Sequence, residues 1–361
     1  MKKTVCVIFG REGYETEVLW KSAAGHLKDA LKRTGLERIF DAPGLFGGDA
    51  APVAVPEDAG MVLAVRSDAV PSDAAALLSA EAPRRFMDED GLAAFLLDAR
   101  RFAALAESGG SAETVMRVPE GRASFERGFA ANASARERFE LTGRLNREKL
   151  SALLVGGVRL LSADGVLVCP DAELGEGCEI LPGTVIKGGV KVGKDCLLGP
   201  NTLLEDCTVG DGCVINASQV YSSRIGCGVR IGPFSHIRPN CAIGDGVKIG
   251  DFVELKNSSL GGKTSVAHLT YVGDSDVGAR VNFGCGCVTV NYDGKRKSRT
   301  VIGDGAFIGC NSNLVAPVEV EEGSYIAAGS TITDTVPQDA LAIARARQTV
   351  KPGWAKKRRE E

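Results

Sequence analysis

Residues 174–203 read LGEGCE, ILPGTV, IKGGVK, VGKDCL and LGPNTL, which are consecutive units of six residues. Each unit begins with Ile, Leu or Val, and its fifth position carries Cys, Val or Thr. Six residues form a short strand and a turn, three such units close one triangular coil, and coils stack about 4.8 Å apart. The repeat predicts a parallel β-helix whose interior is filled by the first position of each unit.

The six-residue period continues through most of the remaining chain. It slips near Cys207, resumes in VGDGCV, and returns late in IGDGAF, IGCNSN and IAAGST. Roughly 165 residues at about 18 per coil give about nine coils. We expect a small α/β domain at 1–130, a linker helix at 131–160, the β-helix at 161–337 and a C-terminal tail at 338–361.

Composition limits the kinds of partner that the protein binds. The chain has 361 residues, a formal net charge of -3 and a pI near 5.8, so there is no overall attraction to nucleic acid or anionic lipid. No apolar run approaches the roughly 18 residues of a membrane span, and the start lacks a signal sequence. We expect a cytoplasmic protein with no nucleic-acid partner and no membrane span.

Cysteine is frequent, but the 11 residues are scattered and show no zinc-binding spacing. Five of them fall at the fifth position of the six-residue unit, namely Cys178, Cys196, Cys213, Cys241 and Cys287. This pattern indicates small apolar fillers of the interior in a reducing compartment.

Three stretches interrupt the repeat, and a solenoid's functional residues usually lie in such interruptions. They are 237–260, 266–300 and the tail from 340 to 354. His268 lies in the second of them, and imidazole is the side chain best suited to act as a base near neutral pH. The alternative for His268 is a histidine exposed on a surface turn.

The interruptions contain the motifs IRP, FVELKNS, HLTYVGDS, NYDGK, LVAPV and IAAGSTIT in this order. With them, residues 146–354 resemble the acetyltransferase half of the bifunctional GlmU family, which acetylates glucosamine 1-phosphate and also uridylylates it. The resemblance implies a left-handed parallel β-helix, acetyl-CoA as co-substrate, no metal in this half, and a homotrimer with sites between neighbouring subunits. It implies direct transfer to the amine, giving N-acetylglucosamine 1-phosphate for UDP-N-acetylglucosamine synthesis.

The resemblance also assigns roles to individual residues. His268 matches the general base, and the backbone N–H of Cys285 would be the donor to the oxyanion. Residues matched to the sugar phosphate are Arg238, Glu254, Lys256, Tyr271, Asn282, Asn291 and Tyr292. Residues matched to acetyl-CoA are Cys285, Lys297, Cys310, Ala328 and Arg345. Cys285 and Cys310 depart from the family, because many members carry Ala and Ser there; without the motifs, Arg238 and Lys256 would equally fit solvated surface charges.

The first 130 residues resemble a shortened nucleotidyltransferase domain with its site damaged. The strand KTVCVIFG is followed by REGYETEVLW, in which Glu17 stands where the family has a phosphate-binding lysine. Asp68 would be the remnant of the metal-binding aspartate, and Mg²⁺ is expected only if uridylyl transfer survives. The stretch DEDGLAAFLLDARRFAALAE predicts a helix.

Three alternatives to a glucosamine-1-phosphate acetyltransferase remain open at this point. The first is a bifunctional enzyme that retains UTP-dependent uridylyl transfer, and the second is a non-catalytic paralogue. The third is acetylation of a different amino sugar.

Overall fold

A computed structural model describes the chain in two compact units. The first comprises Met1–Ser151 with Val168–Pro170, and the second Ala152–Leu167 with Asp171–Glu361. The structure describes residues 3–9, 17–18, 21–36, 38–42, 59–66, 70–71, 84–88, 91–98, 102, 122–125, 129–130 and 135–360. Within these residues, no helix is long and apolar enough to cross a membrane.

The first unit contains a six-stranded mixed sheet in the order β4-β1-β5-β8-β7-β9. Its strands are β1 (Lys3–Phe9), β4 (Ile39–Ala42), β5 (Ala59–Arg66), β7 (Arg84–Asp88), β8 (Gly91–Asp98) and β9 (Arg122–Phe125). The helix α2 (Ala23–Arg33) contributes Leu27 and Leu31 to a core with Ile8, Leu63 and Leu96. The prediction of a small α/β part ahead of the β-helix is confirmed.

One expectation for this unit is wrong. The stretch GLAAFLLD forms strand β8, antiparallel to β5 and β7, and not a helix. Ala94 and Leu96 are buried in the sheet. A short continuous apolar run fits a buried strand as well as a helix, and its alanines led to the incorrect prediction of a helix.

The sequence-predicted nucleotide site is mostly outside the described residues, which include neither Asp68 nor the loop before Glu17. Glu17 itself begins β2 (Glu17–Val18), which pairs with β3 (Lys21–Ser22). The described residues of this part also include β6 (Val70–Pro71), β10 (Phe129–Ala130) and the helix α6 (Ala135–Val155).

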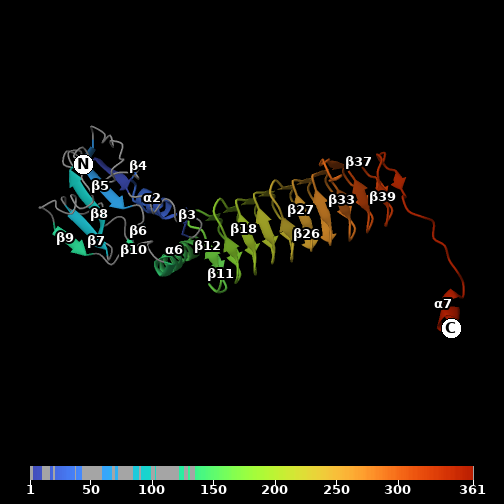
Figure 1. Ribbon diagram of the computed structural model, residues 1–361, viewed down its shortest axis with the longest axis horizontal. Helices are drawn as coiled ribbons and strands as arrows, with labels where there is room; N and C mark the ends of the chain where they lie inside the picture. Colours follow the sequence, from blue (N-terminus) through green and yellow to red (C-terminus); the bar gives the residue numbers. More distant parts are fainter. Residues whose placement is uncertain are drawn as a thin grey trace. The chain divides into compact units, whose positions relative to one another are not determined.

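The second unit is a parallel β-helix with three sheets (Figure 1). The first sheet has 11 strands: β11 (Arg159–Leu160), β14 (Glu179–Ile180), β17 (Leu197–Leu198), β20 (Val214–Ile215), β23 (Arg230–Ile231), β26 (Lys248–Asp251), β29 (Ser265–His268), β32 (Asn282–Phe283), β35 (Phe307–Ile308), β38 (Tyr325–Ile326) and β40 (Leu341–Ala342). The second sheet has 10 strands: β12 (Leu167–Val168), β15 (Val185–Ile186), β18 (Leu203–Glu205), β21 (Gln219–Tyr221), β24 (His236–Ile237), β27 (Glu254–Lys256), β30 (Tyr271–Gly273), β33 (Val288–Val290), β36 (Asn313–Val315) and β39 (Thr331–Ile332). The third sheet has 9 strands: β13 (Glu173–Leu174), β16 (Lys191–Val192), β19 (Thr208–Val209), β22 (Arg224–Ile225), β25 (Ala242–Ile243), β28 (Ser259–Leu260), β31 (Ser275–Val277), β34 (Thr300–Ile302) and β37 (Val318–Val320). The helix α7 (Trp354–Glu360) follows the last coil.

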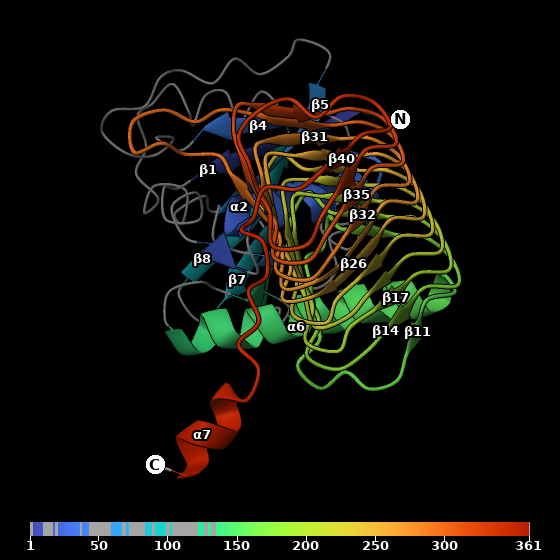
Figure 2. The same cartoon turned by 90° about the vertical axis from the view of Figure 1, so that its right-hand side faces the viewer.

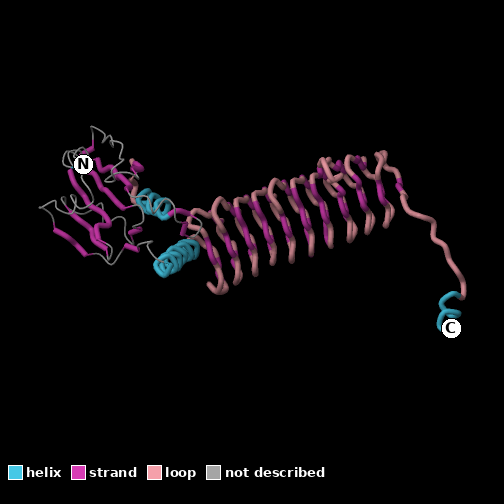
Figure 3. Tube along the Cα trace, viewed as in Figure 1, coloured by secondary structure: helices cyan, strands magenta, loops and turns pink. Residues whose placement is uncertain are grey.

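Corner turns separate the short strands (Figure 3), and the coils superpose when viewed along the stack (Figure 2). Ile180, Ile186 and Leu198, at the first position of their units, are fully buried. Cys178 and Thr184, at the fifth position, are fully buried as well. Burying each large aliphatic side chain contributes about 1.5–3 kcal/mol. The predicted parallel β-helix of hexapeptide repeats is confirmed.

The coils differ in length, and the corners absorb the differences. Glu179 pairs with Leu197, 18 residues later, and Lys191 pairs with Thr208, 17 residues later. Ser275, however, pairs with Thr300. The additional residues form the loop 291–299 between β33 and β34, which lies within the interruption at 266–300.

Glycine is required at some corners because the next coil lies so close. Gly232 has a φ of 104°, and a methyl group there would overlap the carbonyl oxygen of Asn216. Only glycine adopts this conformation without strain and leaves room for the neighbouring backbone.

Candidate functional site

His268 and Asp251 form a hydrogen-bonded pair on neighbouring coils. They end strands β29 and β26 and lie opposite each other in the register of the first sheet. His268 Nδ1 lies 2.7 Å from Asp251 Oδ1, and this bond holds the pKa of the Asp251 carboxyl below its usual range. A carboxylate accepts only a proton-bearing Nδ1, which leaves Nε2 of a neutral imidazole with a free lone pair. The histidine side chain is 58% exposed, so Nε2 can reach a substrate.

Sequence analysis identified His268 and missed Asp251. The signal was present in the repeat, because Asp251 precedes His268 by one coil at the same corner. A residue one coil away contacts a side chain more directly than most sequence neighbours do.

Above His268, three of the residues matched to acetyl-CoA occupy the same corner on successive coils. Gly286 N–H donates to His268 O at 3.4 Å, and Asn311 N–H donates to Cys285 O at 2.8 Å. Gly329 N–H donates to Cys310 O at 2.8 Å, so Ala328 is the next member. We call Asp251, His268, Cys285, Cys310 and Ala328 the corner column.

The tail brings Arg345 to the end of the corner column. Thr331 N–H donates to Ala344 O at 3.2 Å, which holds the tail against the last coil. A methyl group on Gly329 would lie 3.7 Å from Cδ of Arg345. The structure therefore brings together four of the five residues matched to acetyl-CoA.

Proline occupies the corner that the column continues in three earlier coils. Equivalent corner positions in earlier coils are Pro182, Pro200 and Pro233, and proline has no N–H. The stack therefore tolerates a residue without an N–H at this corner.

The residues matched to the sugar phosphate gather on the second sheet. Arg238 Nη1 donates to Glu254 Oε1 at 2.9 Å. Tyr271 lies opposite Glu254 on the next coil, and its ring covers Gly273, where a methyl group would overlap the phenol. Lys256 is level with Gly273 in the same pair of strands.

A buried carboxylate, Asp274, connects this group to the loop 291–299. It accepts hydrogen bonds from Asn257 Nδ2 at 2.5 Å and from Asn291 Nδ2, and Lys256 Nζ lies 3.9 Å from it. Burial raises the pKa of Asp274, but these amide hydrogen bonds and the Lys256 charge outweigh it, so the net shift is downward. Sequence analysis missed Asp274 because its partners come from two other segments, Lys256 with Asn257 and the distant Asn291.

Lys297 lies with the sugar-phosphate residues and not with the corner column. The adjacent Lys256 ammonium lowers the pKa of Lys297, as expected for two like charges in contact. Within one chain, Lys297 therefore lies apart from Cys285, Cys310 and Ala328, which are also matched to acetyl-CoA.

The loop 291–299 is held at both ends. Asn291 binds Asp274, and Arg299 forms a bidentate ion pair with Asp276 at 2.6 and 2.8 Å. Between them, Asp293 accepts the N–H groups of Lys295 and Arg296. Arg299 is thus engaged by the protein, and Lys295, Arg296 and Lys297 are exposed.

Two matched residues stand apart from the rest. Asn282 is exposed on the first sheet, between Ser265 and Phe307 in register, whereas Glu254 and Tyr271 are on the second. Tyr292 is 56% exposed, and its hydroxyl donates to Gly294 O within the loop. One chain therefore does not assemble all the matched residues.

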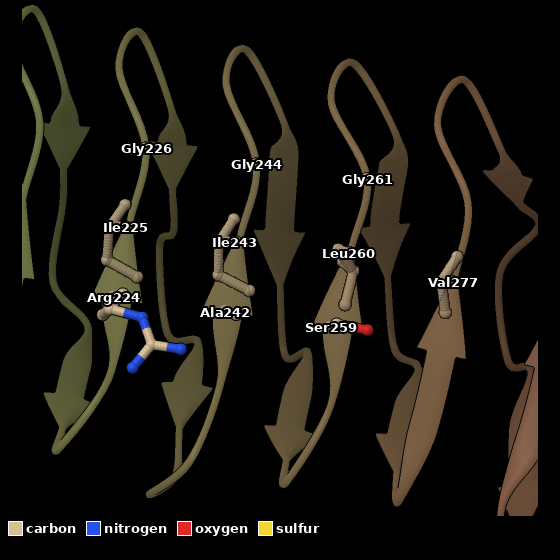
Figure 4. A pocket seen from close by; sticks show the side chains of 10 residues that line it. All are labelled: Arg224, Ile225, Gly226, Ala242, Ile243, Gly244, Ser259, Leu260, Gly261 and Val277. Atoms are coloured by element: carbon tan, nitrogen blue, oxygen red, sulfur yellow. The ribbon is translucent and has the colours of Figure 1, made fainter.

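A separate hollow lies on the third sheet (Figure 4). Its volume is about 480 Å³, and its walls include Arg224, Ala242 and Ser259. None of the matched residues lines it.

Comparison with known proteins shows which part of the chain is similar to them. Residues 171–205, 222–257 and 299–334 match the family model "Bacterial transferase hexapeptide (six repeats)". The bifunctional protein GlmU of Caldanaerobacter subterraneus is 54% identical over 202 residues, which are 56% of this chain and 44% of that protein. The corresponding protein of Bacillus velezensis is 52% identical over 213 residues, 59% of this chain and 46% of that protein. The predicted resemblance to GlmU proteins is confirmed, and the chain spans under half the length of these relatives.

A solved structure of an Arabidopsis UDP-N-acetylglucosamine acyltransferase is also similar. It is 18% identical with a TM-score of 0.44, and the match covers 50% of this chain and 70% of that one.

Proposed function

We propose that this chain, which resembles bifunctional GlmU proteins over more than half its length, is an acetyltransferase. It moves the acetyl group of acetyl-CoA to the amine of glucosamine 1-phosphate, giving N-acetylglucosamine 1-phosphate for UDP-N-acetylglucosamine synthesis. The observation that carries the proposal is the Asp251–His268 pair at the base of a corner column that leads through Cys285 and Cys310 to Arg345.

The pair supplies the base for direct transfer. Nε2 of His268 takes a proton from the amine as the amine nitrogen attacks the thioester carbonyl carbon. The N–H of Cys285 stabilises the oxyanion of the tetrahedral intermediate. When the C–S bond breaks, the thiolate of coenzyme A leaves and takes up a proton.

The charges on the second sheet and on the loop 291–299 suit a phosphate dianion. Lys256 and Lys297 lie in contact, and two adjacent ammonium groups are stabilised by a bound anion. Arg238, fixed by Glu254, adds a guanidinium that can bind phosphate bidentately. Tyr271 and Asn291 supply a hydroxyl and an amide to the sugar.

We further propose that the active form is a homotrimer with each site shared between neighbours. The separation of Asn282 from Glu254 on different sheets supports a second chain that completes the site. The rings of Phe234 and Phe252 stack with their centroids 5.5 Å apart, and they lie beside Asp251 and His268. Both side chains are largely exposed, and an exposed apolar pair of this kind is typical of an interface. Threefold symmetry would provide three identical sites. The free thiols support a reducing compartment such as the cytoplasm.

The test is release of coenzyme A thiol from acetyl-CoA in the presence of glucosamine 1-phosphate. We expect His268→Ala to lower kcat by about 10²–10⁴-fold. The control is His236→Ala, which removes an exposed histidine that contacts Tyr221 edge-on. Thiol release that is absent, or equal in wild type and His268→Ala, would contradict the proposal. Pyrophosphate release from UTP in the same preparation measures any uridylyl transfer.

A further inference from the structure

Two accessible thiols occupy adjacent positions in the corner column. Of the 11 cysteines, Cys310 and Cys227 are exposed, Cys285 is partly exposed, and the rest are buried. Cys285 and Cys310 stand at the same corner on successive coils, since Asn311 N–H donates to Cys285 O at 2.8 Å. Their Cα atoms are thus separated by about one strand spacing, 4.8 Å, which lies within the disulfide range.

The thiol of Cys310 leans toward the coil that carries Cys285. A methyl group on Gly284, the residue before Cys285, would lie 2.8 Å from Sγ of Cys310. Closure of a disulfide then requires the Cys285 side chain to rotate toward Sγ of Cys310.

Cys227 provides a matched comparison. Its Sγ leans on the preceding coil in the same way, 2.8 Å from a methyl group placed on Gly210. The residue after Gly210 is Asp211, and Asp245 accepts the Cys227 N–H from the other side. Cys227 therefore has the same exposure and orientation but aspartates as its neighbours.

We propose that Cys285 and Cys310 form a reactive dithiol, a modification site for low-molecular-weight disulfides. The thiolate of Cys310 attacks a disulfide R–S–S–R, forms a mixed disulfide and releases one R–SH. The thiolate of Cys285 then attacks the Cys310 sulfur, releases the second R–SH and closes the Cys285–Cys310 bond. Two protein thiols are oxidised, and one external disulfide is reduced to two thiols.

The location links this modification to the co-substrate, and this step rests on the proposed function. Both cysteines lie between His268 and Arg345 on the surface proposed for acetyl-CoA. Bound acetyl-CoA would cover the thiols, and a closed disulfide would alter the surface that receives the thioester. We expect acetyl-CoA to slow the oxidation and oxidation to lower acetyl transfer.

The experiment treats the full chain with oxidised glutathione and maps its cysteines by mass spectrometry without reduction. We expect a cross-linked pair of peptides containing Cys285 and Cys310, two hydrogens lighter than the reduced peptides. Cys285→Ser and Cys310→Ser should each leave a glutathione adduct on the remaining cysteine, and Cys227→Ser should leave the cross-link unchanged. Separate adducts on Cys285 and Cys310 in the wild type, or modification of Cys227 alone, would overturn the dithiol.

Protection distinguishes the two levels of the proposal. Acetyl-CoA at ten times its Kd should slow cross-linking about tenfold. Cross-linking that acetyl-CoA does not slow overturns the link to the co-substrate. A chain that cross-links as expected but fails the thiol-release assay overturns the proposed function and leaves the dithiol standing.

Discussion

Asp251 orients the histidine that we propose as the base. The hydrogen bond from His268 keeps the pKa of Asp251 low, so the carboxylate is ionised throughout the neutral range. A carboxyl whose pKa is lowered by folding stabilises the folded protein at any pH above the pKa that the group has in the unfolded chain. This contribution is lost as the pH falls through the pKa of the folded state. The pair is therefore intact at neutral pH and breaks in acid.

We expect Asp251→Asn to lower kcat for acetyl transfer, but by less than His268→Ala, because the base remains and only its orientation is weakened. KM for acetyl-CoA should change little. Steady-state kinetics with both substrates checks this. A kcat equal to that of the wild type would show that Asp251 has no positioning role.

Gly250 lies where the coil that carries Asp251 packs against the coil that carries His268, and this packing sets the position of the histidine. A methyl group there would overlap the carbonyl oxygen of Ala267, the residue before His268. We expect Gly250→Ala to displace the histidine and reduce acetyl transfer while the circular dichroism spectrum stays that of a β-helix. Gly262→Ala is the control, because its nearest new neighbour, Asp245 O, is 3.2 Å away. Equal activity in both variants would contradict this prediction.

Among the elements, the loop 291–299 depends most on its attachments. Asp274 holds the Asn291 end inside the protein, and Arg299 holds the other end at the surface. Removing Asp274 takes this acceptor from the Asn257 amide and leaves Asn291 Nδ2 with only its long bond of 3.4 Å to the Tyr271 hydroxyl, at a cost of about 1–3 kcal/mol. The Arg299–Asp276 pair is 43% and 50% exposed, so screening by solvent limits its contribution to about 0.2–1 kcal/mol.

We therefore expect amide exchange in the loop to accelerate more in Asp274→Ala than in Arg299→Ala. Hydrogen-exchange mass spectrometry measures the difference. Arg280→Ala removes the exposed ion pair with Asp304 and should leave the loop unchanged. The opposite order would mean that the surface ion pair is the main anchor. Because the pKa of Asp274 is lowered, the loop should also loosen only when the pH falls below the usual carboxyl range.

At the scale of the whole β-helix, stability comes from a continuous apolar interior. We expect Leu198→Ala to lower the free energy of unfolding by about 2–5 kcal/mol, because Leu198 is fully buried and the stacked coils cannot close the cavity. Val185→Ala, at a half-buried position of strand β15, should cost less. Urea denaturation followed by circular dichroism compares them, and equal losses would contradict the interior assigned to Leu198.

The same periodic interior explains which features could be predicted from sequence. A six-residue period fixes the strand, the corner and the inward position together, so the β-helix and the buried Cys178 follow from the pattern. Asp251 and Asp274 were missed because their contacts join successive coils, and a reading along the chain does not place those coils side by side. Strand β8 was mistaken for a helix because a short apolar run has no periodicity that distinguishes a strand from a helix. Asn282 was grouped with Glu254 by resemblance, and only the sheet order separates them.

The register between coils also determines how this chain can change length in evolution or by engineering. Duplication of one complete circuit, such as residues 193–209, would add about 4.8 Å to the stack and preserve the order of everything from Asp251 to Arg345. Deletion of one strand residue would instead turn the following side chains of that strand inside out. Protein engineers who wish to vary the spacing between the start of the stack and its reactive corner should therefore add or remove entire circuits, and confine single-residue changes to the corners.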